Sequence, residues 1–130
     1  MTGLIWFIQV VHYPLFARVG KNHYEAYQAS HMRLTTWVVG PIMMIEATTG
    51  VAMFFVRLES VPDMLVWANL GLLGVIWIST LVWQVPQHEI LLGGFDAVAH
   101  HRLVASNWVR TVAWTVRALL LSGFLLVVLG

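Results

Sequence analysis

The sequence predicts an all-α integral membrane protein: a four-helix bundle built from two parallel helical-hairpin repeats, with short interfacial helices. Three observations predict this class. Hydrophobic residues make up 59% of the 130 residues and charged residues only 10%, whereas soluble domains contain about 45–50% and about 25%. Four long stretches carry little or no charge, and the two halves of the chain show similar landmarks in the same order.

The same composition argues against several classes of protein. So little charge cannot cover a water-facing surface, which argues against a soluble enzyme. The net charge of +1 argues against nucleic-acid binding, which needs a concentrated basic patch. Because the sequence has no cysteine, a metal or haem would have to bind to His, Asp, Glu or Met side chains.

Each of the four apolar stretches is expected to be a membrane-spanning helix, because backbone polar groups in lipid must be satisfied internally. The first stretch is close to the lower length limit of about 17 residues. It lacks the basic start and the cleavage site of a signal peptide. In a single domain of residues 1–130, the predicted spans are residues 2–19, 34–56, 64–85 and 107–129.

Two prolines and two connectors organise the rest of the chain. Pro14 and Pro86 are expected to break or kink their helices, because proline lacks a backbone N–H. Residues 22–32 and 87–102 mix apolar and polar side chains, which predicts short helices at the membrane surface, the second interrupted by a Gly-Gly pair. Lys and Arg are more frequent on these connectors than on the opposite side. The positive-inside rule therefore places both connectors in the cytoplasm of a bacterial inner membrane and both termini outside.

The two halves are related by an offset of roughly 70 residues, as in proteins with internal repeats. The shared landmarks are Pro14, Glu25-Ala26, His31-Met32-Arg33 and Trp37 in the first half, and Pro86, Asp96-Ala97, His101-Arg102 and Trp108 in the second. Because each unit would contain two spans, both units would have the same orientation. The alternative is that helical hairpins in general share such punctuation.

Polar residues within the predicted spans indicate where a site would lie. An ionisable residue there costs at least about 2.5 kcal/mol on insertion scales, so it is usually functional or paired. We expect the polar stripes to surround one cavity that opens toward the cytoplasm, with Glu46 at its floor. The stripes consist of Gln9, His12, Tyr13 and Phe16; of Gln84 and His88; and of Asn107, Arg110, Trp114 and Arg117.

Some of these residues also allow a structural interpretation. Glu46 could pair with Arg110 or Arg117 and bridge the helices. Gly71 and Gly74 in the third span predict close approach of another helix. The connector histidines are expected to be solvated; they are His23, His31, His100 and His101.

His12 and His88 are the best histidine candidates for chemistry. By depth they could ligate a haem or a pigment, as two histidines on facing helices of a bundle can. The sequence contains no haem-attachment motif. No metal site is predicted, because Glu46 lies at a different depth from both histidines.

Several of these motifs resemble those of small, largely uncharacterised bacterial four-span membrane proteins, over most of the chain. The motifs are Leu4-Ile5-Trp6, His12-Tyr13-Pro14-Leu15-Phe16, Pro41 with Glu46, Gln84-Val85-Pro86-Gln87-His88, and Asn107-Trp108-Val109-Arg110-Thr111. More distantly, the chain resembles the anthrone-oxygenase-like membrane family, which shares the four-span plan and an Asn-Trp-x-Arg start to the last span. That resemblance implies oxidation of polycyclic aromatic phenols, with Asn107, Trp108 and Arg110 matching the last-span motif.

Three functions follow as hypotheses. In the first, the protein binds or oxidises a flat, apolar quinone- or anthrone-like molecule. His12, His88, Glu46 and Arg110 are then the catalytic candidates, and Tyr13, Phe16, Gln84, Asn107, Trp114 and Arg117 the ligand-binding ones. In that hypothesis Arg110 stabilises oxyanion charge and a histidine moves a proton. In the second, the chain is an accessory subunit of a larger respiratory or photosynthetic membrane complex, and in the third it is part of a transporter that works as an oligomer.

Overall fold

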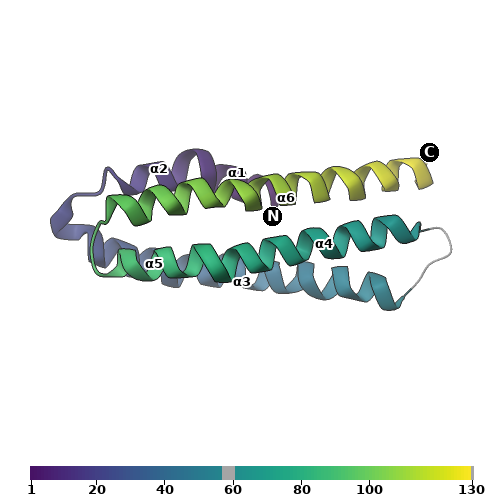
Figure 1. Cartoon of the computed structure of the whole chain (residues 1–130), viewed down its shortest axis with the longest axis horizontal. Helices are drawn as coiled ribbons and strands as arrows, with labels where there is room; N and C mark the ends of the chain where they lie inside the picture. The colour runs from purple at the N-terminus through teal and green to yellow at the C-terminus, as the bar shows by residue number, and fades with distance from the viewer. Residues whose placement is uncertain (57–60, 130) are drawn as a thin grey trace.

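The computed structural model describes residues 1–56 and 61–129, which are almost wholly helical (Figure 1). No strand occurs in these two ranges. Three helical stretches are long and apolar enough to cross a membrane: Lys21–Phe55, Asp63–Leu92 and Ala97–Val128, of 35, 30 and 32 residues. A span needs about 20 apolar residues. The predicted class, a helical integral membrane protein, is therefore confirmed.

The outer surface agrees with lipid contact. Large apolar side chains are exposed along the helices, including Trp37 at 76%, Leu126 at 75% and Val127 at 81%. Contiguous apolar surface of this extent is rare on soluble monomers. These faces therefore meet hydrocarbon rather than water.

The chain starts with a shorter apolar helix, Thr2–Phe16. It consists of α1 (Thr2–Phe7), the π-helical turn η1 (Ile8–His12) and α2 (Tyr13–Phe16). At about 1.5 Å per residue it is roughly 22 Å long, less than the ~30 Å hydrocarbon core. That this helix is a fourth membrane span therefore stays a prediction, and so does the repeat architecture.

The remaining elements follow in three groups. A short 3₁₀ turn leads into the second helix, as η2 (Lys21–His23) and α3 (Tyr24–Phe55). The third helix has three parts: α4 (Asp63–Ser79), the π-helical turn η3 (Thr80–Gln84) and α5 (Val85–Leu92). The last is α6 (Ala97–Leu129).

The separate interfacial helices predicted at residues 22–32 and 87–102 are not present. Residues 24–32 are the first turns of α3, because no Gly or Pro separates them from the apolar stretch that follows. The second predicted segment is divided at Gly93 and Gly94, as expected, between the end of α5 and the start of α6. Gly94 has a φ of 123°, a conformation that favours glycine.

Neither Pro14 nor Pro86 breaks its helix, so of the predicted break or kink the break does not occur. Each follows a five-residue π-helical turn, η1 or η3. The residue before each proline bonds five positions back: Tyr13 N–H to Ile8 O, and Val85 N–H to Thr80 O. A π turn holds one more residue than an α turn, and this widening accommodates the ring that would otherwise clash with the preceding turn. Both helices thus continue to carry side chains beyond the proline.

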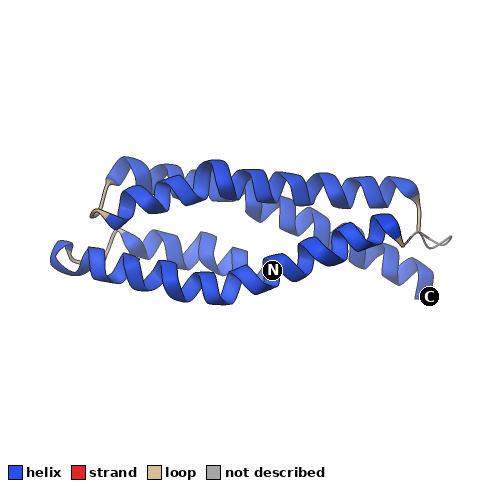
Figure 2. Cartoon of the chain, turned by 90° about the horizontal axis from the view of Figure 1, so that it is seen from below, coloured by secondary structure: helices blue, strands red, loops and turns tan. Residues whose placement is uncertain are grey.

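Helix α6 is the centre of the packing (Figures 1 and 2). It packs against α1, η1 and α2, and also against α4, η3 and α5. Helix α3 packs against α4 and α5, but its Cα atoms do not come within 8 Å of the Cα atoms of α1, η1, α2 or α6. Side chains alone therefore close the seam between the first helix and α3.

Helices α3 and α4 pack tightly at Gly50. A Cβ atom there would overlap the side chain of Leu73, and Asn69 Nδ2 donates a hydrogen bond of 3.3 Å to the Gly50 carbonyl. Nothing lies within 4 Å of a Cβ placed at Gly71 or Gly74. The close approach predicted at Gly71 and Gly74 is thus wrong, because these glycines lie away from the contact with α3.

Candidate functional site

A cavity of about 170 Å³ lies among η1, α2, α3, η3, α5 and α6. Apolar side chains such as Met43 make up part of its wall. The polar part includes Tyr13, His31, Gln84, His88 and Arg110. Residues from both halves of the sequence thus meet around one space.

His88 and Tyr13 form the best-defined polar contact of this cavity. The hydroxyl of Tyr13 lies 3.0 Å from Nε2 of His88. On the other side of the ring, Gln28 Nε2 donates to Nδ1 at 2.9 Å. The neutral imidazole then carries its hydrogen on Nε2 and donates it to the Tyr13 oxygen. The hydroxyl hydrogen of Tyr13 is left to be donated to a ligand.

Two further histidines continue this cluster. His31 Nδ1 lies 2.9 Å from His12 Nε2 and 3.1 Å from Thr35 Oγ1. The ring centroids of His31 and His88 are 5.3 Å apart. His12 and His88, both predicted as catalytic, are therefore connected through a third imidazole rather than to each other.

His31 is the residue that sequence reasoning missed. We expected it to be solvated in a connector, but it is 7% exposed and lines the cavity. This error follows from the prediction of a separate interfacial helix. Because α3 is continuous from Tyr24 onward, one face of this helix carries Gln28, His31 and Thr35. That spacing was the available signal.

Arg110 of α6 is a buried cation without a carboxylate partner in the described part of the chain. It is 5% exposed, and its guanidinium lies 5.1 Å from the ring centroid of Trp114. It also interacts with the side chain of Tyr13. Its Nε atom has no hydrogen-bond partner. Buried charges are normally paired, so Arg110 has unused capacity to bind an anion or a carbonyl oxygen.

Gln84 supplies an unused acceptor on the same cavity. Its Nε2 donates to Ser106 Oγ at 2.7 Å, while its Oε1 has no partner. The side chain is 2% exposed. Two residues of the wall, Arg110 and Gln84, thus each have a buried polar atom without a hydrogen-bond partner among the described residues.

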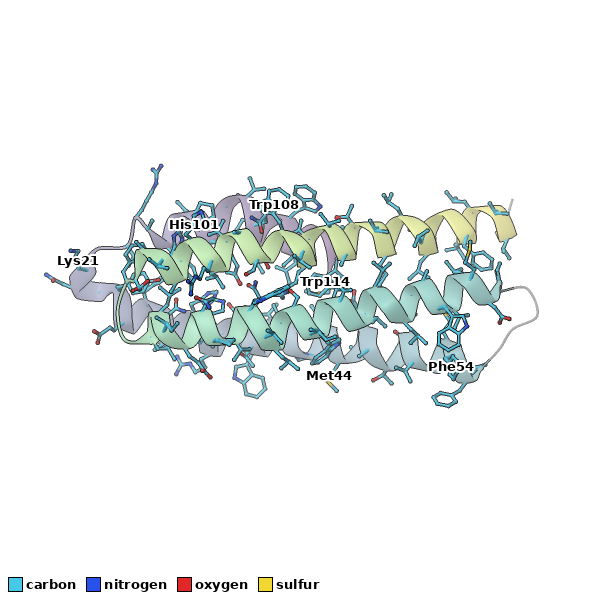
Figure 3. All side chains as sticks on the ribbon, viewed as in Figure 1. Lys21, Met44, Phe54, His101, Trp108 and Trp114 are labelled. Carbon is cyan, nitrogen blue, oxygen red and sulfur yellow. The ribbon has the colours of Figure 1, made fainter. Side chains whose placement is uncertain are left out.

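Glu46 does not form the floor of this cavity. Its Oε2 accepts a 2.7 Å hydrogen bond from Trp114 Nε1, and its Oε1 lies 3.6 Å from Arg117 and 3.5 Å from the amino group of Met1. Figure 3 shows Trp114 in the interior between α6 and α4. The expected single pocket is therefore replaced by two neighbouring groups, with the indole of Trp114 in contact with both.

The second group bridges three helices. Arg117 Nε donates to Asn69 Oδ1 at 2.8 Å, and Asn69 donates to the Gly50 carbonyl. Glu46 and Gly50 belong to α3, Asn69 to α4 and Arg117 to α6. Glu46 therefore pairs with Arg117, as the structural interpretation anticipated, and this group holds helices together.

Two further residues predicted to bind the ligand, Phe16 and Asn107, also lie outside the cavity lining. Asn107 donates to Gln9 Oε1 at 2.7 Å and fastens η1 to α6. Phe16 is fully buried and packs edge-on against His12 and His31, with ring centroids 5.2 and 4.9 Å away. Phe16 and Asn107 therefore support the cavity from behind.

A haem or pigment does not fit the observed arrangement of His12 and His88. Both ring nitrogens of His88 are already in hydrogen bonds, and a cavity of about 170 Å³ is much smaller than a porphyrin. Among the described residues, no three His, Asp or Glu side chains are grouped to hold a metal ion. The donors present suit an organic ligand with polar oxygens better.

Comparisons of the chain with protein-family models, with curated proteins and with solved structures find no match.

Proposed function

We propose that this chain is a four-span membrane protein that binds a flat, apolar molecule carrying ionisable oxygens, such as a hydroxyquinone or a polycyclic phenol. The observation that carries the proposal is the buried, carboxylate-free Arg110 on a cavity wall shared with Tyr13 and His88. A ligand oxyanion would supply the missing countercharge. An apolar ring would fill the space beside Met43 and Val39.

Each polar group has a role in this proposal. The Arg110 guanidinium and the Tyr13 hydroxyl donate to the oxyanion, as preorganised donors do for developing negative charge. Gln84 Oε1 accepts a hydrogen from a neighbouring ligand hydroxyl. A proton released by the ligand passes to the His31–His12 pair, because both ring nitrogens of His88 are already in hydrogen bonds. Oxidation of the ligand, which the family resemblance implies, stays a prediction beyond this binding step.

The proposed topology places this cavity in the cytoplasmic half of the bilayer. The connectors between α2 and α3 and between α5 and α6 lie at the same end of the molecule (Figure 1). The positive-inside rule assigns that end, which carries Arg18, Lys21 and Arg102, to the cytoplasm of a bacterial inner membrane. The two π turns before Pro14 and Pro86 support two parallel hairpin repeats.

Replacement of Arg110 by Gln tests the proposal. The probe is 2-hydroxy-1,4-naphthoquinone, which is anionic at neutral pH, added to the purified protein in lipid nanodiscs. A hydrogen bond to a charged group contributes about 1.5–3 kcal/mol, so Kd from calorimetric titration should rise roughly 10- to 150-fold. The matched control is Arg102→Gln, which removes an exposed arginine at the same end of α6. Equal affinity of wild type and Arg110→Gln would overturn the proposal.

A further inference from the structure

A second hollow, of about 240 Å³, lies in the seam between α1–η1 and α3. Its lining is mostly apolar and includes Leu4, Phe7, Leu34 and Val38. Three of these side chains are half-exposed on the outer surface: Phe7 at 54%, Leu34 at 59% and Val38 at 55%. In a membrane this hollow therefore opens sideways to the acyl chains.

The hollow adjoins the first cavity. Ile8, Thr35 and Val39 line both spaces. His12 lines the second space and is hydrogen-bonded to His31, which lines the first. The two spaces therefore lie side by side, and the first has Tyr13, His31 and Arg110 among the residues of its wall.

The packing of the helices leaves room for the second space between α1 and α3. The Cα atoms of α1 and α3 do not come within 8 Å of each other, whereas α6 packs directly against both α1 and α4. The polar cavity, at about 170 Å³, falls below the ~300 Å³ of the smallest common ligand pockets. The volumes of the two spaces, about 170 and about 240 Å³, together reach the usual range of ligand pockets.

We propose that the ligand is amphiphilic: its oxygen-bearing ring occupies the polar cavity, and a linear hydrocarbon tail lies in the seam between α1 and α3 and reaches the lipid. This inference rests on the proposed function and adds the ligand's tail and its route of access. A tail fits because the seam is lined mostly by apolar side chains, shares three lining residues with the first cavity, and has half-exposed side chains at its outer surface. The same seam lets the ligand arrive from the bilayer without crossing water.

The experiment compares two ligands with the same ring. One is 2-hydroxy-1,4-naphthoquinone and the other carries an undecyl chain at its 3-position; Kd is measured for both in nanodiscs of one lipid composition. Val38→Trp fills the seam, because Val38 lines the second space and not the first. Val112→Trp is the matched control, since Val112 is also 55% exposed on the apolar surface but lines neither space. We expect Val38→Trp to weaken the tailed ligand more than tenfold and to leave the tailless one within twofold.

The outcomes separate this inference from the proposed function. If the tailless ligand binds in an Arg110-dependent manner while Val38→Trp leaves the tailed ligand unaffected, the tail inference is wrong and the proposed function stands. If neither ligand binds, both are wrong. Should Val38→Trp fail to fold, Val38→Cys gives a second measurement, because the natural chain has no cysteine. The tailed ligand, and not the tailless one, should then slow labelling by N-ethylmaleimide at position 38; equal rates would overturn the inference.

Discussion

Arg110 and Arg117 lie on the same helix and are both buried, yet their surroundings differ in one respect. Arg117 has a carboxylate, Glu46, within 3.6 Å, whereas no carboxylate pairs with Arg110 in the described residues. An unpaired buried charge is costly, and a buried cation is usually retained where it has a partner or a use. This contrast separates a group that joins helices from the group for which we propose ligand binding.

Replacement of Glu46 by Gln should destabilise the protein without weakening ligand binding. The variant removes the charge that pairs with Arg117 but keeps an amide oxygen for Trp114. Since Glu46 is partly exposed, we expect a loss of about 1–3 kcal/mol, typical of a hydrogen bond to a charged group. The measurement is unfolding of the detergent-solubilised protein, monitored by circular dichroism.

Glu89→Gln serves as the control for Glu46→Gln, because Glu89 is an exposed carboxylate on α5. It should leave stability unchanged. A Glu46→Gln protein of normal stability that no longer bound the hydroxyquinone would show that the placement of Glu46 outside the site is wrong.

The contact between α3 and α4 depends on a single small residue. Gly50 has no room for a larger side chain, because Leu73 occupies the position that a Cβ atom would take. The carbonyl of Gly50 also accepts the hydrogen bond from Asn69, which in turn holds Arg117. Separation of α3 from α4 would therefore break the hydrogen bond between Gly50 and Asn69 and disturb the one between Asn69 and Arg117 of α6.

Gly50→Val should separate α3 from α4. Overpacking of a tight contact costs typically about 1–3 kcal/mol, and loss of the Asn69 bond adds to it. We expect a lower midpoint of thermal unfolding in detergent. The matched variant is Gly74→Val on α4, where a Cβ atom meets nothing within 4 Å. Similar midpoints for the two variants would contradict the assignment of this contact to Gly50.

The arrangement of the chain in the bilayer makes a separate prediction. Asn22 lies in the connector between α2 and α3, and Val61 lies at the opposite end, next to α4. In the absence of native cysteines, Asn22→Cys should react with a membrane-impermeant maleimide only from the cytoplasmic side, and Val61→Cys only from outside. Inverted membrane vesicles and intact cells give the two sides. Labelling of both positions from the same side would contradict the proposed topology.

The sequence was sufficient for the class of the molecule and for much of its polar interior. Low charge and long apolar stretches predicted four membrane-spanning helices, of which three are long and apolar enough to cross a membrane, and Tyr13, Gln84, His88 and Arg110 do line one cavity. Helical spacing could not show which polar stripe faces which neighbour. The assignment of Glu46 to the cavity failed for that reason: its partner on α6 is Arg117, with Trp114 between the two groups.

The errors along the chain have a common physical cause. A proline usually ends a helix, but the extra residue of a π turn accommodates it, and single-sequence periodicity does not reveal such a turn. The mixed polarity of residues 24–32 likewise looked like a surface helix although nothing there interrupts α3. The loss of His31 from the predicted site followed directly from that error.

The two π turns also determine the shape of the cavity's walls. Ile8 and Tyr13 are five positions apart, as are Thr80 and Val85, and all four side chains line the cavity. In a regular α-helix, neighbours on one face are three or four positions apart; here the i→i+5 bond brings the fifth residue into line. Two parts of the cavity wall, from different helices, thus repeat the same five-residue turn followed by a proline. A substitution that returned either turn to α-helical geometry would therefore rotate the lining side chains beyond it.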